Sequence, residues 1–310
     1  MDNYEIIEKV FYSITETFLA LGFGALLFKK NYISAGEMSR LSTLSLDVFF
    51  PILTFSTIVK SFSVDNWQEA VLMPVLGFVL MALGALLGYM LLWGLRNSST
   101  ARQRTFHHLC AINNYVLLPL IVVGNLWGER HVALLLLMNV GSTIGFWTIG
   151  IITFTGIEEG LKKWRNILSW NIYAVLLAVG WVLTGWKMPL VLTETTTLLG
   201  CLAVPFMLIL SGAALMQTVN GLLKNPFDAI YFAVIRLFLL PLVIIMLLKL
   251  LPLPPEVYQV VFVVALMPAA VSSVLVAREY GGSAEFTGQA IMITTFLSLL
   301  TIPLMIAWLL

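Results

Sequence analysis

One apolar stretch of the chain holds polar residues whose spacing suits the binding of an anion. Residues 109–125 read LCAINNYVLLPLIVVGN, with adjacent amides at Asn113 and Asn114 and a proline at Pro119. Proline lacks an N–H group and clashes with the preceding turn, so a helix is expected to open before Pro119. The amides and the freed N–H groups would suit a carboxylate. The alternative is a kink whose polar groups are satisfied by neighbouring helices.

The composition places this stretch inside a membrane. The 310 residues are 60% hydrophobic and 11% charged, whereas a soluble domain carries about 25% charged residues. The net charge of +1 gives no indication of a nucleic-acid partner. The N-terminus is acidic, which is unlike a cleaved signal peptide. We therefore expect the lipid bilayer to be the main surrounding of this chain.

Ten apolar segments are long enough to span a bilayer as helices. They lie at about 8–28, 38–60, 70–94, 105–125, 132–155, 167–186, 195–217, 228–251, 257–277 and 286–309. The loops after odd segments hold eleven basic residues and the opposite loops hold five. The eleven are Lys29, Lys30, Arg40, Arg96, Arg102, Arg104, Lys162, Lys163, Arg165, Lys224 and Arg278. This bias predicts an all-α polytopic protein of the plasma (inner) membrane with both termini extracytoplasmic.

Prolines recur at corresponding places in the two halves of the chain. Pro51 and Pro119 lie in segments 2 and 4, and Pro205 and Pro268 lie in segments 7 and 9. Five segments per half would give the halves opposite orientations in the membrane. We therefore predict two inverted five-helix repeats, at 1–155 and 167–310, joined by a cytoplasmic linker at 156–166. The alternative is that prolines are simply frequent in membrane helices.

Several motifs together resemble one transporter family. The C-terminal pattern is Met-Pro, a small polar stretch, Ala-x-x-Tyr-Gly and then Thr-x-x-Ser-x-x-Thr-x-Pro. It comprises Met267, Pro268, Ala277, Tyr280, Gly281, Thr295, Ser298, Thr301 and Pro303. INNYVLLPLIVVGNLWGE, LSLDVFFPILTFSTI and RLFLLPL (236–242) match other helices of the same family. In order and spacing, the set resembles the auxin efflux carrier family, which includes PIN-formed auxin exporters and bacterial malate or malonate permeases.

The resemblance implies a fold shared with bile acid:sodium symporters. Helices 4 and 9 would each break and cross as an X near the membrane midplane. Helices 3–5 and 8–10 would form a moving transport domain. Helices 1, 2, 6 and 7 would form a scaffold and the contact of a homodimer. The resemblance also places Ser272 where many bacterial members have Asn, and we include Ser273 beside it as a substrate-binding candidate together with Pro119 and Pro268.

Other polar residues within the segments are candidates for ion coupling. Asp47 lies four residues before Pro51 and could carry a proton or pair with a basic side chain. Asn139 and Thr295 could line a cation site or simply form hydrogen bonds between helices. Arg236, inside segment 8, could attract anions or pair with Asp47, but we mainly expect it to extend its charged group toward water.

The leading interpretation is a secondary active transporter or facilitator that exports small organic anions by alternating access. Its substrates would be mono- or dicarboxylates, including auxin-like acids, and no cofactor, metal or nucleic acid is expected. The alternative is a sodium-coupled organic-anion symporter of the bile-acid type. An intramembrane enzyme is not supported, since there is no H-E-x-x-H motif and no catalytic residue is expected. A channel would show flux that does not saturate, and a sensory receptor would bind its ligand without flux.

Overall fold

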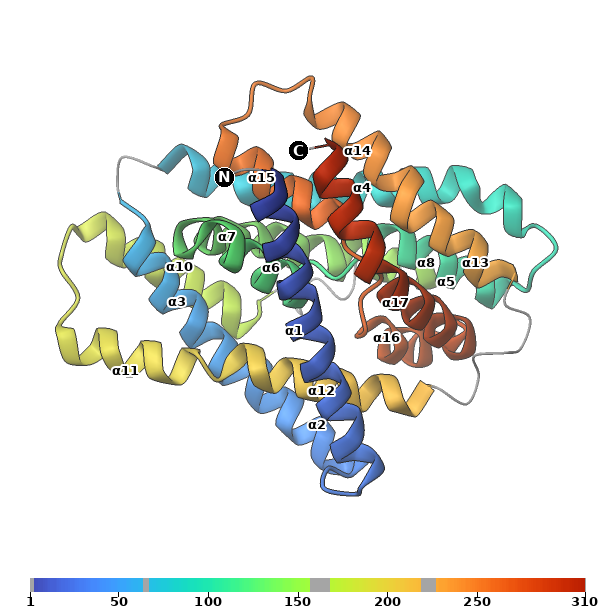
Figure 1. The fold of residues 1–310 in the computed structure, drawn as a ribbon, viewed down its shortest axis with the longest axis horizontal. Helices are drawn as coiled ribbons and strands as arrows, with labels where there is room; N and C mark the ends of the chain where they lie inside the picture. The colour runs from blue at the N-terminus through green and yellow to red at the C-terminus, as the bar shows by residue number, and fades with distance from the viewer. Residues whose placement is uncertain (1–2, 64–66, 157–167, 219–226, 310) are drawn as a thin grey trace.

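The computed structural model describes the chain as a bundle of helices (Figure 1). It covers residues 3–63, 67–156, 168–218 and 227–309. Nearly all of the expected linker at 156–166 lies outside these residues, as do Lys162, Lys163, Arg165 and Lys224. In this part of the chain the α-helices are α1 (Asn3–Lys29), α2 (Ala35–Leu44), α3 (Phe50–Ser61), α4 (Trp67–Leu91), α5 (Thr100–Ala111), α6 (Leu117–Trp127), α7 (Glu129–Gly145), α8 (Ile151–Thr155), α10 (Trp170–Thr184), α11 (Leu190–Gly200), α12 (Ala203–Thr218), α13 (Phe227–Val234), α14 (Leu240–Leu248), α15 (Pro255–Ala265), α16 (Ser273–Glu279) and α17 (Ala284–Leu309). A 3₁₀ turn at Leu92–Leu95 and π-helical turns at Ser45–Phe49, Phe146–Gly150 and Ile235–Leu239 complete the set.

Seven helical stretches of the described chain are long and apolar enough to cross a membrane. They are Glu5–Lys29, Ala35–Ser61, Gln68–Leu95, Glu129–Thr155, Leu190–Gln217, Phe227–Leu248 and Ala284–Leu309. Three shorter apolar helices are Leu117–Trp127, Trp170–Thr184 and Pro255–Ala265. The prediction of an all-α polytopic membrane protein is confirmed, and two of the shorter helices lie in segments 4 and 9.

Glycines allow two pairs of helices to pack with their backbones in contact. A Cβ atom at Gly212 of α12 would overlap the carbonyl oxygen of Leu21 in α1. A Cβ atom at Gly141 of α7 would overlap the carbonyl oxygen of Pro74 in α4 in the same way. Small residues at such contacts let membrane helices approach closely, which is a main source of their packing energy. These two helix pairs are therefore among the tightest contacts of the bundle.

The remaining packing joins helices that are distant in sequence. Helix α3 packs against α10 and α11, and α1 packs against α6 and α17 as well as α12. The start of α1 and the end of α17 both lie in the upper part of Figure 1. Segments from the two halves of the chain thus interleave in one bundle.

Two prolines follow π-helical turns in helices that remain continuous. The N–H of Phe50 donates to the carbonyl of Ser45, just before Pro51. The N–H of Leu240 likewise donates to the carbonyl of Ile235, just before Pro241. A proline ring clashes with the carbonyl four residues earlier, and the wider π turn accommodates it. Segments 2 and 8 therefore accommodate these prolines in a wider turn without opening.

Candidate functional site

The first helix break lies in segment 4, at the two adjacent amides. Helix α5 ends at Ala111, and α6 begins at Leu117 with Pro119 in its first turn. The side-chain oxygen of Asn114 accepts a hydrogen bond of 3.1 Å from the N–H of Leu117. Because the first N–H groups of a helix have no partner within it, this amide oxygen satisfies one of those at the start of α6.

The second break lies in segment 9. Helix α15 ends at Ala265 and α16 begins at Ser273, with Pro268 buried between them. The N–H groups of Leu266 and Met267 still bond to the last carbonyls of α15, at 3.1 and 3.2 Å. The hydrogen bonding of α15 therefore continues as far as Met267 and stops at Pro268.

Hydrogen bonds join these two breaks directly. The backbones of Asn113 and Ala269 form an antiparallel bridge, and the N–H of Asn114 donates to the carbonyl of Pro268 at 2.8 Å. The side-chain nitrogen of Asn113 donates to the carbonyl of Val264 at 2.6 Å. We call residues 112–116 and 266–272 together the crossover. Backbone groups freed by each break are thus partly satisfied by the other break.

A buried arginine holds the carbonyl ends of both broken helices. Arg236 is 2% exposed, and its guanidinium donates to the carbonyls of Met267 (2.9 Å), Ala265 (3.1 Å) and Cys110 (3.4 Å). The prediction that Arg236 extends toward water is therefore wrong. Carbonyl groups at two helix ends provide partners that keep the charge inside the bundle.

Comparison with known proteins assigns the chain to a family. The sequence model of the family described as "Membrane transport protein" matches residues 9–306. The chain belongs to this family, which is that of the auxin efflux carriers. An uncharacterised transporter of Methanothermobacter thermautotrophicus is 24% identical over 305 residues, covering 95% of this chain and 98% of that protein. The predicted family is thereby confirmed, and the protein is a membrane transporter.

Within this family member, the substrate-site candidates of segment 4 differ in accessibility. Asn113 is 2% exposed and Pro119 is buried, whereas Asn114 is half-buried. The side-chain nitrogen of Asn113 already has the carbonyl of Val264 as its partner. Asn114 is therefore the amide of the pair that is better placed to meet a ligand.

The candidates of segment 9 lie in and beside the second break. Pro268 is buried, and its carbonyl accepts the hydrogen bond from Asn114. Ser272 is exposed, while the hydroxyl of the buried Ser273 has no hydrogen-bond partner among the described residues. The structure thus brings Asn113, Asn114 and Pro268 together and places both serines at the end of the same break.

The three candidates for ion coupling do not form one cluster of contacts. Asp47 is exposed on the π turn of segment 2 and makes no ion pair with another described residue. Asn139 is 4% exposed, and its side-chain oxygen has no partner in the described part of the chain. Thr295 lies on α17, but its neighbour Thr294 contacts the crossover, where its hydroxyl oxygen accepts from the N–H of Ala269 at 3.3 Å. The sequence alone did not indicate which of these two adjacent threonines contacts the crossover.

One arginine joins the starts of three helices at one end of the bundle. Arg102, in the first turn of α5, pairs with Asp228 of α13 at 2.8 Å and lies 3.8 Å from Glu285 of α17. It also donates to Gln289 at 3.4 Å. Both carboxylates lie in the first turn of their helix, where negative charge is favourable.

A second arginine does the same for three other helices. Arg130, in the first turn of α7, pairs with Glu69 of α4 and with Glu256 of α15, the latter at 3.2 Å. It also donates to the carbonyl of Ser61 at 3.3 Å and stacks over Phe62, 4.6 Å from the ring centre. This cluster therefore also contacts the end of α3 and the residue that follows it.

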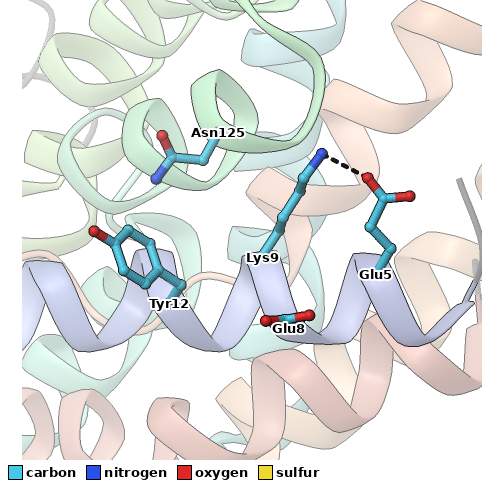
Figure 2. Close-up of a pocket in the computed structure, with 5 residues that line it drawn as sticks. All are labelled: Glu5, Glu8, Lys9, Tyr12 and Asn125. Atoms are coloured by element: carbon cyan, nitrogen blue, oxygen red, sulfur yellow. Dashed lines mark ion pairs between the residues drawn. The ribbon is translucent and has the colours of Figure 1, made fainter.

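A shallow pocket of about 280 Å³ lies at the start of α1 (Figure 2). Glu5, Glu8, Lys9 and Tyr12 of α1 line it together with Asn125 of α6. Lys9 and Glu5 form an ion pair of 2.9 Å, with side chains 41% and 49% exposed. Exposed pairs of this kind, four residues apart on one helix, have a mainly local stabilising role, so the pocket is not our candidate site.

Proposed function

We propose that this family member is a secondary transporter of small organic anions whose binding site is the crossover. The observation that carries the proposal is the hydrogen-bonded junction of two helix breaks, with half-buried Asn114 and exposed Ser272 at its edge. Paired broken helices are the usual place of substrate sites in secondary transporters. The substrates would be mono- or dicarboxylates, including auxin-like acids, and the proposed direction is export.

The two arginine clusters support an arrangement of ten membrane helices as two inverted repeats. Arg102 joins the starts of segments 4, 8 and 10, and Arg130 joins the starts of segments 5, 3 and 9. Adding five to segments 3, 4 and 5 of the first half gives segments 8, 9 and 10 of the second. Segments 4, 8 and 10 of the Arg102 cluster therefore correspond to segments 9, 3 and 5 of the Arg130 cluster. In two of these pairs, 4 with 9 and 10 with 5, a basic residue in one cluster corresponds to an acidic residue in the other.

Helix pairing follows the same correspondence. Segment 1 packs against segment 7 through α1 and α12, and segment 6 packs against segment 2 through α10 and α3. We propose that these four segments form the scaffold and homodimer contact, and that segments 3–5 and 8–10 form the moving transport domain. The protein would lie in the plasma membrane with both termini extracytoplasmic, as the basic loops favour.

An anion suits the crossover better than a sodium ion does. The acidic residues of α7, α15, α16 and α17 are Glu129, Glu256, Glu279 and Glu285. All four lie in the first or last turn of their helix, away from the breaks. A cation site at the crossover would therefore have no carboxylate ligand among the described residues of these helices, so we place the sodium-coupled alternative second.

Uptake into proteoliposomes tests this function. Radiolabelled malonate, malate, lactate and indole-3-acetate would each be offered to wild type, to Asn114→Ala and to Asn125→Ala. Asn125 is an amide at the far end of the same helix and is the matched control. We expect saturable uptake and counterflow of at least one anion, lost in Asn114→Ala and retained in Asn125→Ala.

Two results would contradict the proposal. Equal uptake by both variants would remove Asn114 from the site. Flux that does not saturate and shows no counterflow would indicate a channel. Because loss of the hydrogen bond between Asn114 and the N–H of Leu117 costs about 1 kcal/mol, the amount of folded Asn114→Ala protein must be measured beside its uptake.

A further inference from the structure

The position of Arg236 in its helix directs its side chain into the bundle. It lies in the π-helical turn Ile235–Leu239, which ends two residues before Pro241. Its neighbours Ile235 and Leu237 are 3% and 1% exposed. A π turn changes the direction of side chains relative to a regular helix and occurs often at functional sites. The turn thus presents a permanent charge to the interior at the level of the crossover.

The charge of Arg236 is balanced by helix ends rather than by a carboxylate. No ion pair joins Arg236 to a described acidic residue. Its three acceptors are carbonyls in the last turn of α5, at the last residue of α15 and two residues beyond it. Each helix C-terminus carries about half a negative charge, so two ends offset about one positive charge.

We propose that Arg236 is the built-in cation of the crossover. Its guanidinium binds the carbonyls that could otherwise coordinate a co-transported metal ion, and its charge allows a carboxylate to enter without one. Carbonyls of unwound segments and of half-helix C-termini are the usual sodium ligands of secondary transporters. Without Arg236 the two carbonyl ends would leave the crossover negative and unfavourable for an anion. This inference rests on the proposed function for its substrate, but its cation part can be tested without any substrate.

The first experiment measures thermal unfolding of purified protein in detergent. Wild type, Arg236→Gln and Arg236→Lys would be compared in sodium chloride and in choline chloride of equal concentration. We expect the wild-type Tm to be the same in both salts. Arg236→Gln should unfold at a lower temperature, and sodium should raise its Tm, because the carbonyls are then free to bind the ion.

Arg236→Lys provides the conservative control for this measurement. The ammonium group keeps the charge but lacks the planar fork that reaches several carbonyls. Its Tm should lie between the other two and should not respond to sodium. A wild-type Tm that rises with sodium would overturn the inference, and so would an Arg236→Gln protein that ignores sodium.

The second experiment asks whether the charge acts on the substrate. Lactate with lactamide, and indole-3-acetate with indole-3-acetamide, would compete for uptake of the best transported probe anion. Arg236→Gln should lower the preference for the carboxylate over the amide by about tenfold, and Arg236→Lys should restore most of it. A merely structural role would reduce the maximal rate and leave this ratio unchanged, and that result would overturn the inference.

The two experiments separate failure of the inference from failure of the proposed function. If wild type transports none of the probe anions, the proposed substrate class fails, while the comparison of sodium with choline still decides the role of Arg236. If an anion is transported with an absolute need for sodium, the proposed transport remains and the inference is overturned.

Discussion

Replacing Asn113 separates the structural role of the buried amide from a role in binding. Its side-chain nitrogen lies 2.6 Å from the carbonyl oxygen of Val264, which is 1% exposed. That carbonyl also accepts the N–H of Met267 at 3.2 Å. Asn113→Ala therefore removes one hydrogen bond without leaving the acceptor alone.

The expected loss in stability follows from this geometry. A typical buried hydrogen bond contributes about 0.5–1.5 kcal/mol, and bonds between membrane helices average about 0.6 kcal/mol. We expect Asn113→Ala to lower the free energy of unfolding by about 1 kcal/mol, which corresponds to a Tm about 2 °C lower. Asn113→Asp should lose about 3 kcal/mol or more, because a buried carboxylate would face the Val264 carbonyl.

Thermal unfolding in detergent, followed by the size-exclusion peak of the folded protein, measures both effects. Acidic buffer should relieve part of the loss in Asn113→Asp, since a protonated carboxyl regains a donor for the carbonyl. Equal Tm values for the two variants would show that the side chain does not donate to Val264. Transport abolished in Asn113→Ala despite a loss near 1 kcal/mol would give this amide a direct role in binding.

Two further predictions concern packing and charge. Arg130→Gln should destabilise the protein by about 2 kcal/mol, because two carboxylates lose their shared partner. The loss is limited because one of these carboxylates, that of Glu256, is 44% exposed. Arg96→Gln, an exposed control, should stay within about 0.5 kcal/mol of wild type in the same assay. Gly212→Ala should lower stability by about 2 kcal/mol or more by separating α1 from α12. Gly22→Ala, where a Cβ atom meets nothing within 4 Å, should not lower it. Similar unfolding temperatures within either matched pair would contradict the corresponding contact.

Local sequence patterns predict the helices and the place of the first break well. Apolar length indicates a membrane helix, and a proline after two amides indicates where its backbone opens. Helix α6 accordingly begins two residues before Pro119. The same rule overstates the effect of Pro51, where a π turn keeps the helix continuous. A local rule identifies a strained position but not the way in which the chain relieves the strain.

The hydrogen-bond partners of Arg236 could not be predicted, because they are distant in sequence. The carbonyl acceptors lie 29, 31 and 126 residues away from it. Only the packing of segment 8 against both breaks brings them together, and no pattern around Arg236 encodes that contact. The preference of the crossover for Thr294 over Thr295 has the same origin, since it depends on the rotation of α17 against segment 9.

The two arginine clusters differ in one respect that bears on alternating access. The Arg102 cluster joins helices α5, α13 and α17, all within the proposed transport domain. The Arg130 cluster joins α4, α7 and α15 and also contacts Ser61 and Phe62, which belong to or follow α3 of the proposed scaffold. Any motion of the transport domain along the scaffold must therefore break contacts of Arg130 and leave those of Arg102 in place. If the proposed alternating access holds, we therefore expect the contacts of Arg130 with Ser61 and Phe62 to differ between its two states, and the ion pairs of Arg102 to stay the same.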